Sequence, residues 1–565
     1  MTTSELTAPP SPSLRSKFLV SALSVLIIVF LFVLAFMLGS LVAATGLHDP
    51  DSCWLLASGK YIWENGKLPN TDPFSYTFQL GDRPFVMYQW LTELLFYAIF
   101  KVCGLAGLLT IAALSATMTF IALPLSASRR LPRSRAAVIL LIVLMVGAAS
   151  FHILIRPEIV SYTILSLWAS LVLLWRKGMF DDANEQISES ASPSKDEISL
   201  SEKVLENGIG WKAPLILSAL MLFWANFHSA FTLGLIVVVL LIIGYSFEIK
   251  RASDDLARNL VAMSIGLFLC LSVTLINPRG LGLWLYLPSL YFSSMNKYIA
   301  ELKPLGVKEL FDPTYAPFYI LSMLTVYLVV RALAHSHVED FKVTGRTYSI
   351  LIVAFAVISG ITARRMIPFD AILMAYESLF LLYLLFVKSN SDASRLSLYD
   401  RLNLKLEQLL KTSLAASFST FGIASLFGAY IICGRIVPPS LPQGSGAFHV
   451  PLEAIQFLKD HPLKGHIFND AQFGDVMIWH IGSTIPVFVD TRYDMYGDRF
   501  IREYQILRFS EPACLDIIQK YAIENIFVPT DSQLIKTLSK DQDWHELYRD
   551  KTAVILAKQP QLNRP

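Results

Sequence analysis

Two aspartates follow the first long apolar run of the chain and could supply a base. Asp49 and Asp51 come directly after residues 18–47, which are almost all apolar. A carboxylate placed there is close to a bilayer yet hydrated, so it can accept a proton from a substrate held at the membrane surface. The alternative is structural, with Asp51 capping the helix that follows and Asp49 solvated in a loop. The residues alone favour neither reading.

Further polar residues recur at the ends of later apolar runs, and all of them are expected on one face of the membrane. Ionisable groups at membrane depth are costly and tend to line pathways or sites. Arginine suits phosphate, because its planar fork can donate two hydrogen bonds to the oxygens. Arg364 and Arg365 could instead reach lipid head groups, and His228 alone is more often a packing residue. The set comprises His152, Arg156, Glu158, Asn226, His228, Asn277, Arg279, Arg364, Arg365 and Asp370.

The elements that position these residues are apolar runs long enough to cross a membrane. Of the 565 residues, 54% are hydrophobic and 16% charged, which is far more apolar than a soluble protein of this length. The net charge of +2 gives no general attraction to nucleic acid. A span needs about 20 mostly apolar residues, and the sequence predicts about eleven. They are 18–47, 104–128, 136–153, 157–175, 213–227, 230–247, 260–276, 316–333, 348–363, 369–387 and 413–434.

The distribution of Lys and Arg predicts the orientation. With the N-terminus in the cytoplasm, the loops on that side hold most basic clusters, including 129–135 and 250–258. An odd number of spans then places the chain from about residue 436 outside, which in a bacterium is the periplasm. We therefore expect a multi-pass protein of the bacterial cytoplasmic (inner) membrane. Its parts are a cytoplasmic N-terminus 1–17, a transmembrane domain 18–435 with a first periplasmic loop 46–103, and a periplasmic domain 436–565.

Several segments outside the spans have patterns of their own. In the first loop, Asp51 to Asn65 and Val86 to Val102 have helical spacing and are predicted to lie along the membrane surface. Making the second one a span would place Arg129 to Arg135 outside, against the charge rule. Residues 180–211 are polar and predict a solvated connector, and 388–412 predict an amphipathic helix on the inner surface.

The C-terminal region alternates short apolar strands with helical patterns, which predicts a small α/β domain. The overall fold class is thus a polytopic α-helical membrane protein with a C-terminal α/β domain. This domain has no glycine-rich phosphate loop, and its role is left open.

A series of motifs runs through residues 49–158. It consists of Asp51, Gly66, Arg83-Pro84-Phe85 with Tyr88, Trp90 and Leu91, a turn from Lys101 to Gly104, Arg129-Arg130-Leu131 and Arg156-Pro157-Glu158. This series resembles the GT-C superfamily of integral-membrane glycosyltransferases, especially the bacterial branch of protein mannosyltransferases and lipid A sugar transferases. The motifs NFHSAFTLG, INPRG, ARRMIPF and FVDTRYDMYG also look like those of a bacterial membrane-protein sub-family. The C-terminal domain differs from that of the characterised transferases.

The resemblance implies inverting transfer of a sugar from a polyprenyl-phosphate donor to a lipid, glycan or protein acceptor at the periplasmic membrane face. It makes Asp51 the general base or the group that orients the acceptor, with Asp49 as the second candidate, and Glu158 a supporting carboxylate. Arg156 would contact the donor phosphate. Other contacts are assigned by location to His228, Arg279, Arg364 and Arg365. No cofactor is certain, and a divalent metal held by Asp49 and Asp51 stays possible.

Two other functions remain open at this point. A transporter or flippase of a lipid-linked sugar could use the same arginines and carboxylates as a binding path. Transporters often contain an internal repeat of hydrophobic segments, and none is evident here. A non-catalytic membrane scaffold is the third reading, because the C-terminal domain departs from the known enzymes.

Overall fold

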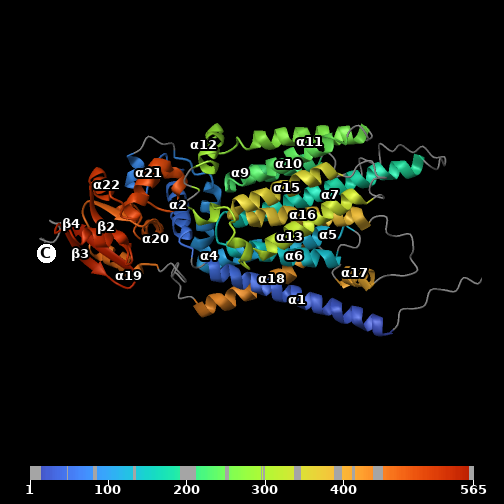
Figure 1. Cartoon of the computed structure of the whole chain (residues 1–565), viewed down its shortest axis with the longest axis horizontal. Coiled ribbons are helices and arrows are strands. Elements are labelled where there is room, and N and C mark those ends of the chain that lie inside the picture. Colours follow the sequence, from blue (N-terminus) through green and yellow to red (C-terminus); the bar gives the residue numbers. More distant parts are fainter. Residues whose placement is uncertain are drawn as a thin grey trace, which may run out of the picture.

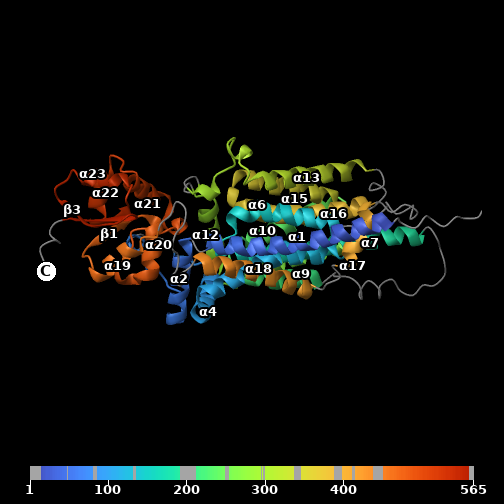
Figure 2. The same cartoon turned by 90° about the horizontal axis from the view of Figure 1, so that it is seen from below.

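A bundle of long apolar helices makes up most of the chain, and a small α/β domain sits at one end of it (Figure 1). α1 begins at the opposite end of the bundle, and the view in Figure 2 shows it running beside α18. The computed structural model describes residues 14–46, 49–80, 85–131, 135–190, 212–248, 254–293, 296, 299–335, 345–386, 398–409, 414–436 and 450–558.

Seven helices of the described residues are long and apolar enough to cross a membrane. They comprise α1 (Leu14–Gly46), α4 (Trp90–Thr117, continuing through η1, Met118–Ala122, and α5, Leu123–Ser128), α6 (Arg135–Ala149), α7 (Glu158–Ser190), α11 (Asp254–Val273), α13 (Ala316–Ala334) and α16 (Ile367–Phe386). Four further apolar helices are α9 (Lys212–Phe227), α10 (Phe231–Ser246), α15 (Arg346–Thr362) and α18 (Leu414–Ile436). Each predicted span corresponds to one of these helices, which confirms the polytopic fold class.

Helix α4 contains a break at Gly104, which separates its spanning part from the surface helix predicted over 86–102. Gly104 has φ 61° and ψ −158°, a conformation that glycine adopts without the clash of a Cβ atom. The helix begins at Trp90, so the prediction of a separate helical segment before the span is confirmed with a later start. This segment packs against α2 (Asp51–Asn65), which has the bounds that the sequence predicts.

The packing of α2 on α4 depends on a glycine. A Cβ atom on Gly59 would lie 2.1 Å from the backbone oxygen of Glu93. We expect Gly59→Ala to force the two helices apart and to lower the free energy of unfolding by about 1–3 kcal/mol, the usual effect of overpacking. The measurement is thermal unfolding in detergent. Gly178→Ala is the matched control, because nothing lies within 4 Å of its Cβ position, and an equal loss there would contradict the prediction.

The polar segments at the other end of the bundle differ in part from expectation. The prediction of a solvated connector over 180–211 is wrong at its start, because α7 continues as a helix to Ser190. Residues 191–211 lie outside the described residues. Within 388–412 the structure describes α17 (Leu398–Leu409), which confirms a helix there. Arg176, on α7, is buried and pairs with Glu377 at 2.5 Å.

The C-terminal domain is built on a four-stranded mixed sheet, so the predicted α/β class is confirmed. Its strand order is β1-β2-β4-β3, with β1 and β2 parallel and the other pairs antiparallel. The strands are β1 (His466–Asn469), β2 (Ile523–Pro529), β3 (Trp544–Arg549) and β4 (Ala553–Lys558). The helices are α19 (Leu452–Asp460), α20 (Ala471–His480), η8 (Gly482–Thr484), α21 (Tyr493–Arg508), α22 (Cys514–Lys520) and α23 (Gln533–Leu538).

The first loop and the C-terminal domain share hydrophobic cores. Phe78 and Phe85 of the loop pack in the same core as Tyr496 of the domain, with Phe78 and Tyr496 in edge contact. The loop also adds a short parallel bridge, in which the Tyr76 N–H donates to the Val487 carbonyl at 3.2 Å. This shared packing fixes the domain over the bundle end that carries α2, as Figure 1 shows.

The remaining described elements lie between the spans. The first loop adds α3 (Tyr76–Gln79) after α2. The connections between the later spans contain η2 (Ser150–His152), α12 (Leu281–Tyr291), η5 (Ala300–Leu302), η6 (Glu309–Phe311) and η7 (Arg364–Met366).

Candidate active site at the junction of the bundle and the C-terminal domain

A cavity of about 120 Å³ lies where the bundle end, the first loop and the C-terminal domain meet. Its lining combines charged groups with aromatic rings, a composition typical of sites that bind a specific small molecule. The polar lining residues are Asp51, Ser58, Gln89, Glu93, Arg156, Glu158, Ser293, Asn296, Arg365, Thr491, Arg492 and Asp494; the aromatic ones are Trp54, Phe85, Tyr88 and Tyr493.

Asp51 stands in the first turn of α2 with its carboxylate in this cavity. The residue at the helix cap is Pro50, which makes no side-chain cap hydrogen bond. The side chain that accepts from the helix start is Asp49, whose Oδ1 lies 3.2 Å from the Asp51 N–H. The reading of Asp51 as a mere helix cap is therefore wrong. Its carboxylate is 18% exposed and is available to a ligand.

Arg156 organises the carboxylates around Asp51. Its guanidinium makes a two-bond pair with Asp49, through Nε to Oδ2 at 2.5 Å and Nη2 to Oδ1 at 2.9 Å. The same Nη2 lies 3.2 Å from Oδ2 of Asp51, and Nη1 lies 3.3 Å from Glu301. Glu301, on η5, also contacts Nε2 of His152 at 3.2 Å. Arg156 thus stands between three acidic side chains and holds Asp51 in position.

The surroundings make Asp51 a stronger base than a solvated aspartate. Burial raises the pKa of Asp51 to about 6, the positive charge of Arg156 opposes that rise, and the nearby Asp49 adds to it. The Thr491 hydroxyl donates to Oδ1 of Asp51 at 2.8 Å. At neutral pH the carboxylate is therefore mostly ionised, yet basic enough to accept a proton from a hydroxyl group as its oxygen reacts.

A second charged pair lines the cavity beside Arg156. Arg365, on η7, pairs through Nη2 with Glu158 at the start of α7. The side chain of Arg365 is 32% exposed, whereas that of Glu158 is 2% exposed. A guanidinium carries five N–H donors, so this pair leaves others for an anion. Arg365 is therefore suited to an anionic group that enters the cavity.

Two buried carboxylate oxygens of the lining have no hydrogen-bond partner among the described residues. They are Oε2 of Glu93 and Oε2 of Glu158. A buried acceptor without a donor is unfavourable by about 1–3 kcal/mol. The hydroxyl groups of a bound ligand could supply the missing donors.

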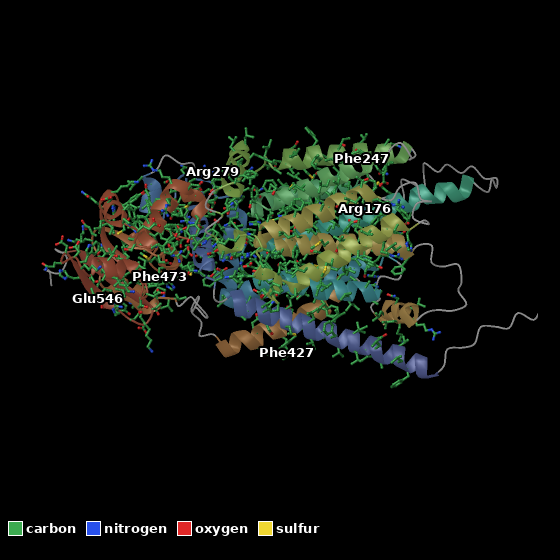
Figure 3. The ribbon with its side chains drawn as sticks, in the orientation of Figure 1. Arg176, Phe247, Arg279, Phe427, Phe473 and Glu546 are labelled. Atoms are coloured by element: carbon green, nitrogen blue, oxygen red, sulfur yellow. The ribbon has the colours of Figure 1, made fainter. Side chains whose placement is uncertain are left out.

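The other predicted site residues lie outside the lining. Asp49 is 3% exposed and sits behind Arg156, and His228 is buried 3.9 Å from Glu158 and beside Ser161. Arg364 pairs with Glu309 at 2.7 Å. Arg279 donates to the Pro69 carbonyl at 3.1 Å and so holds the first loop. Figure 3 shows Arg279 near the junction with the C-terminal domain and Arg176 toward the other end of the bundle.

The described residues hold no group of three or more His, Cys, Asp or Glu side chains that could bind a metal ion. Asp49 and Asp51, the two ligands considered from the sequence, both contact Arg156. The guanidinium supplies the positive charge between them.

The C-terminal domain supplies site residues to which sequence reasoning gave no role. The residues Thr491 and Arg492 just before α21, and Asp494 in its first turn, contribute to the lining. They belong to the motif FVDTRYDMYG, in which charged residues directly follow a buried apolar segment. That abrupt change in polarity was the available signal. Glu93 and Glu301 carry no comparable signal, because each is a single acid in an otherwise apolar or irregular stretch.

The comparisons with solved structures bear on the fold. The oligosaccharyltransferase AglB from Archaeoglobus fulgidus, in complex with an inhibitory peptide and a dolichol-phosphate, matches over 95% of this chain and 74% of its own, with TM-score 0.51 and 12% identity. This chain has the GT-C fold. The apo enzyme from Archaeoglobus fulgidus matches this chain at TM-score 0.50 and 11% identity, over 89% of this chain and 69% of its own.

A third structure is ArnT from Cupriavidus metallidurans bound to undecaprenyl phosphate. It aligns with this chain at TM-score 0.47 and 12% identity, over 96% of this chain and 99% of its own. No family model matches the sequence, and no curated protein sequence matches it.

Proposed function

We propose that this protein is an inverting glycosyltransferase that moves a sugar from a polyprenyl-phosphate donor to a lipid, glycan or protein acceptor. The reaction is placed at the periplasmic face of the bacterial inner membrane, following the distribution of basic loops. One observation carries the proposal. Asp51, a base with a raised pKa, shares a cavity at the end of the bundle with two arginines, Arg156 and Arg365.

Asp51 acts on the attacking acceptor, and the two arginines act on the leaving phosphate. Asp51 takes the proton of the acceptor hydroxyl as its oxygen attacks the anomeric carbon. The bond between that carbon and the phosphate oxygen breaks, and the electron pair leaves with the phosphate. Arg365 and Arg156 stabilise the negative charge of that leaving group. Attack from the face opposite the phosphate inverts the anomeric centre, and no covalent enzyme intermediate forms.

The donor class has support from the comparisons. AglB, which shares the fold, was solved with a dolichol-phosphate, a polyprenyl-phosphate lipid. A cavity at the end of a membrane bundle suits such a donor, because its tail can stay in the bilayer while the phosphate reaches the arginines. The unpaired oxygens of Glu93 and Glu158 suit the hydroxyl groups of its sugar.

Binding of the donor phosphate is tested by a matched pair of arginine variants. We expect Arg365→Gln to weaken binding of a polyprenyl phosphate by about 10- to 100-fold, because a hydrogen bond to a charged group contributes about 1.5–3 kcal/mol. Arg364→Gln is the control, since Arg364 is adjacent in sequence but pairs with Glu309 outside the lining. Affinity is measured with the protein in nanodiscs. Equal affinities for the two variants would remove Arg365 from the proposed phosphate site.

Turnover is tested with the purified protein, a radiolabelled polyprenyl-phosphate sugar and a membrane extract as the source of acceptor. The proposal expects free polyprenyl phosphate to be released together with a labelled product. Tight lipid binding without release would instead favour the transporter or the scaffold.

A further inference from the structure

A single hydroxyl group connects Asp51 to a second buried carboxyl group in the C-terminal domain. Oγ1 of Thr491 lies 2.8 Å from Oδ1 of Asp51 and 2.9 Å from Oδ2 of Asp475. The Thr491 N–H also donates to Oδ1 of Asp475 at 3.0 Å. Asp475 stands on α20, which packs against α2, and its side chain is fully buried.

The number of protons limits how this bridge can form. A threonine hydroxyl carries one proton, so it can donate to only one of the two carboxyl groups. The second short oxygen–oxygen contact needs another proton, which must come from a carboxyl group. One of the two aspartates is therefore neutral when both contacts are made.

The surroundings place that proton on Asp475. Asp51 has the guanidinium of Arg156 at 3.2 Å and is partly exposed, so its charge is stabilised. Asp475 has neither advantage. Burial raises the pKa of Asp475 well above its usual range, and the neighbouring acids Asp51 and Asp490 act in the same direction.

We propose that Asp475 is a positioning residue with a protonated carboxyl group. This group donates a hydrogen bond to the Thr491 hydroxyl and thereby directs the hydroxyl proton to Asp51. The C-terminal domain then completes the site, because the orientation of the base depends on a group that this domain supplies. This inference rests on the proposed function for its kinetic consequence, although the protonation of Asp475 can be measured without it.

Several other titratable groups lie near Asp475 and could affect the pH dependence of transfer. α2 contributes Asp51 and Cys53, Asp490 lies just before α21, and Tyr493 is the first residue of α21. Arg156, Asp49 and Glu301 act on Asp51 from the bundle side. The kinetic test therefore compares variants at Asp475 and Thr491 alone, so that these other groups stay the same.

The acid limb of the pH profile for sugar transfer gives the kinetic test. Thr491→Val removes the hydrogen bond to ionised Asp51. The pKa of Asp51 should then rise, and the acid limb of the pH profile should move to higher pH. Asp475→Leu should do the same and slow transfer by about 10- to 100-fold, as expected for the loss of an orienting partner. Asp475→Asn has an amide N–H that can donate to the Thr491 hydroxyl. This variant should keep the wild-type acid limb and transfer sugar at least tenfold faster than Asp475→Leu. A limb that moves to lower pH in Asp475→Asn, or a rate as low as in Asp475→Leu, would show an ionised Asp475 and overturn the proposal.

The protonation itself is read by infrared difference spectroscopy on the full chain in nanodiscs at neutral pH. The spectrum of the wild type minus that of Asp475→Asn should contain the carbonyl band of a protonated carboxyl group. Absence of that band would overturn the proposal even if Asp475→Leu fails to fold. If no sugar transfer is found, the proposed function fails, whereas the infrared band still decides the state of Asp475.

Discussion

Replacing Asp51 with asparagine is expected to slow sugar transfer by about 10²- to 10⁴-fold, the range for loss of a general base. Asparagine keeps the size of the side chain and can still contact Thr491 and Arg156, but it cannot accept the proton of the acceptor hydroxyl. The measurement is the initial rate of polyprenyl phosphate release by the purified variant, with folding checked by thermal unfolding.

Two further variants accompany this one, a neutral control and a test of the alternative base. Asp543→Asn is the neutral control, because Asp543 is an exposed residue in a turn far along the C-terminal domain. Asp49→Asn should slow transfer less than Asp51→Asn, since Asp49 lies behind Arg156 and outside the cavity lining. Full activity in Asp51→Asn together with loss in Asp49→Asn would transfer the role of base to Asp49.

The pH dependence follows from the same carboxylate. Because the pKa of Asp51 is raised to about 6, the protonated and inactive form accumulates as the pH falls below that value. The rate should therefore rise with pH through about 6 and level off near neutrality. A rate that stays constant between pH 5 and pH 7, a range of about one unit either side, would be inconsistent with Asp51 as the titrating base.

Arg492→Met is expected to lower the free energy of unfolding by about 3–5 kcal/mol, the loss typical of removing one partner from a buried ion cluster. Nη1 of Arg492 contacts Asp72 of the first loop at 2.8 Å, and Nη2 contacts Asp490 at 2.7 Å. Without the arginine, two fully buried carboxylates would face each other with no cation between them. The segment that carries Thr491 and the start of α21 with Asp494 should then leave the cavity.

The measurement is thermal unfolding together with limited proteolysis, which should cut the first loop or residues 490–495 at the start of α21 in the variant. Arg499→Met is the matched control, since Arg499 lies on α21, the helix that Arg492 precedes, has 85% of its side chain exposed and lies 3.7 Å from Glu503. Its effect should stay within about 0.5 kcal/mol. Similar losses in both variants would mean that the buried cluster does not hold the domain in place.

The sequence by itself determined the membrane part of this protein. Runs such as 136–153 and 316–333 are apolar over a length that fits a bilayer, and such a run has few alternatives to a spanning helix. The same holds for α2, whose bounds follow from its periodic apolar face and from Gly66, which ends it with φ 64°. These features depend on local composition and spacing, so a single sequence is enough to predict them.

Only the tertiary structure decided which polar residues share the site. Arg364 and Arg365 are adjacent in sequence and look equivalent there, but Arg365 lines the cavity and Arg364 pairs with Glu309 elsewhere. Asp51 and Thr491 are 440 residues apart and are joined by one hydrogen bond. Such contacts depend on how helix ends and the C-terminal domain are oriented in space. No local pattern records that orientation, because the packing forces that set it act between segments far apart in the chain.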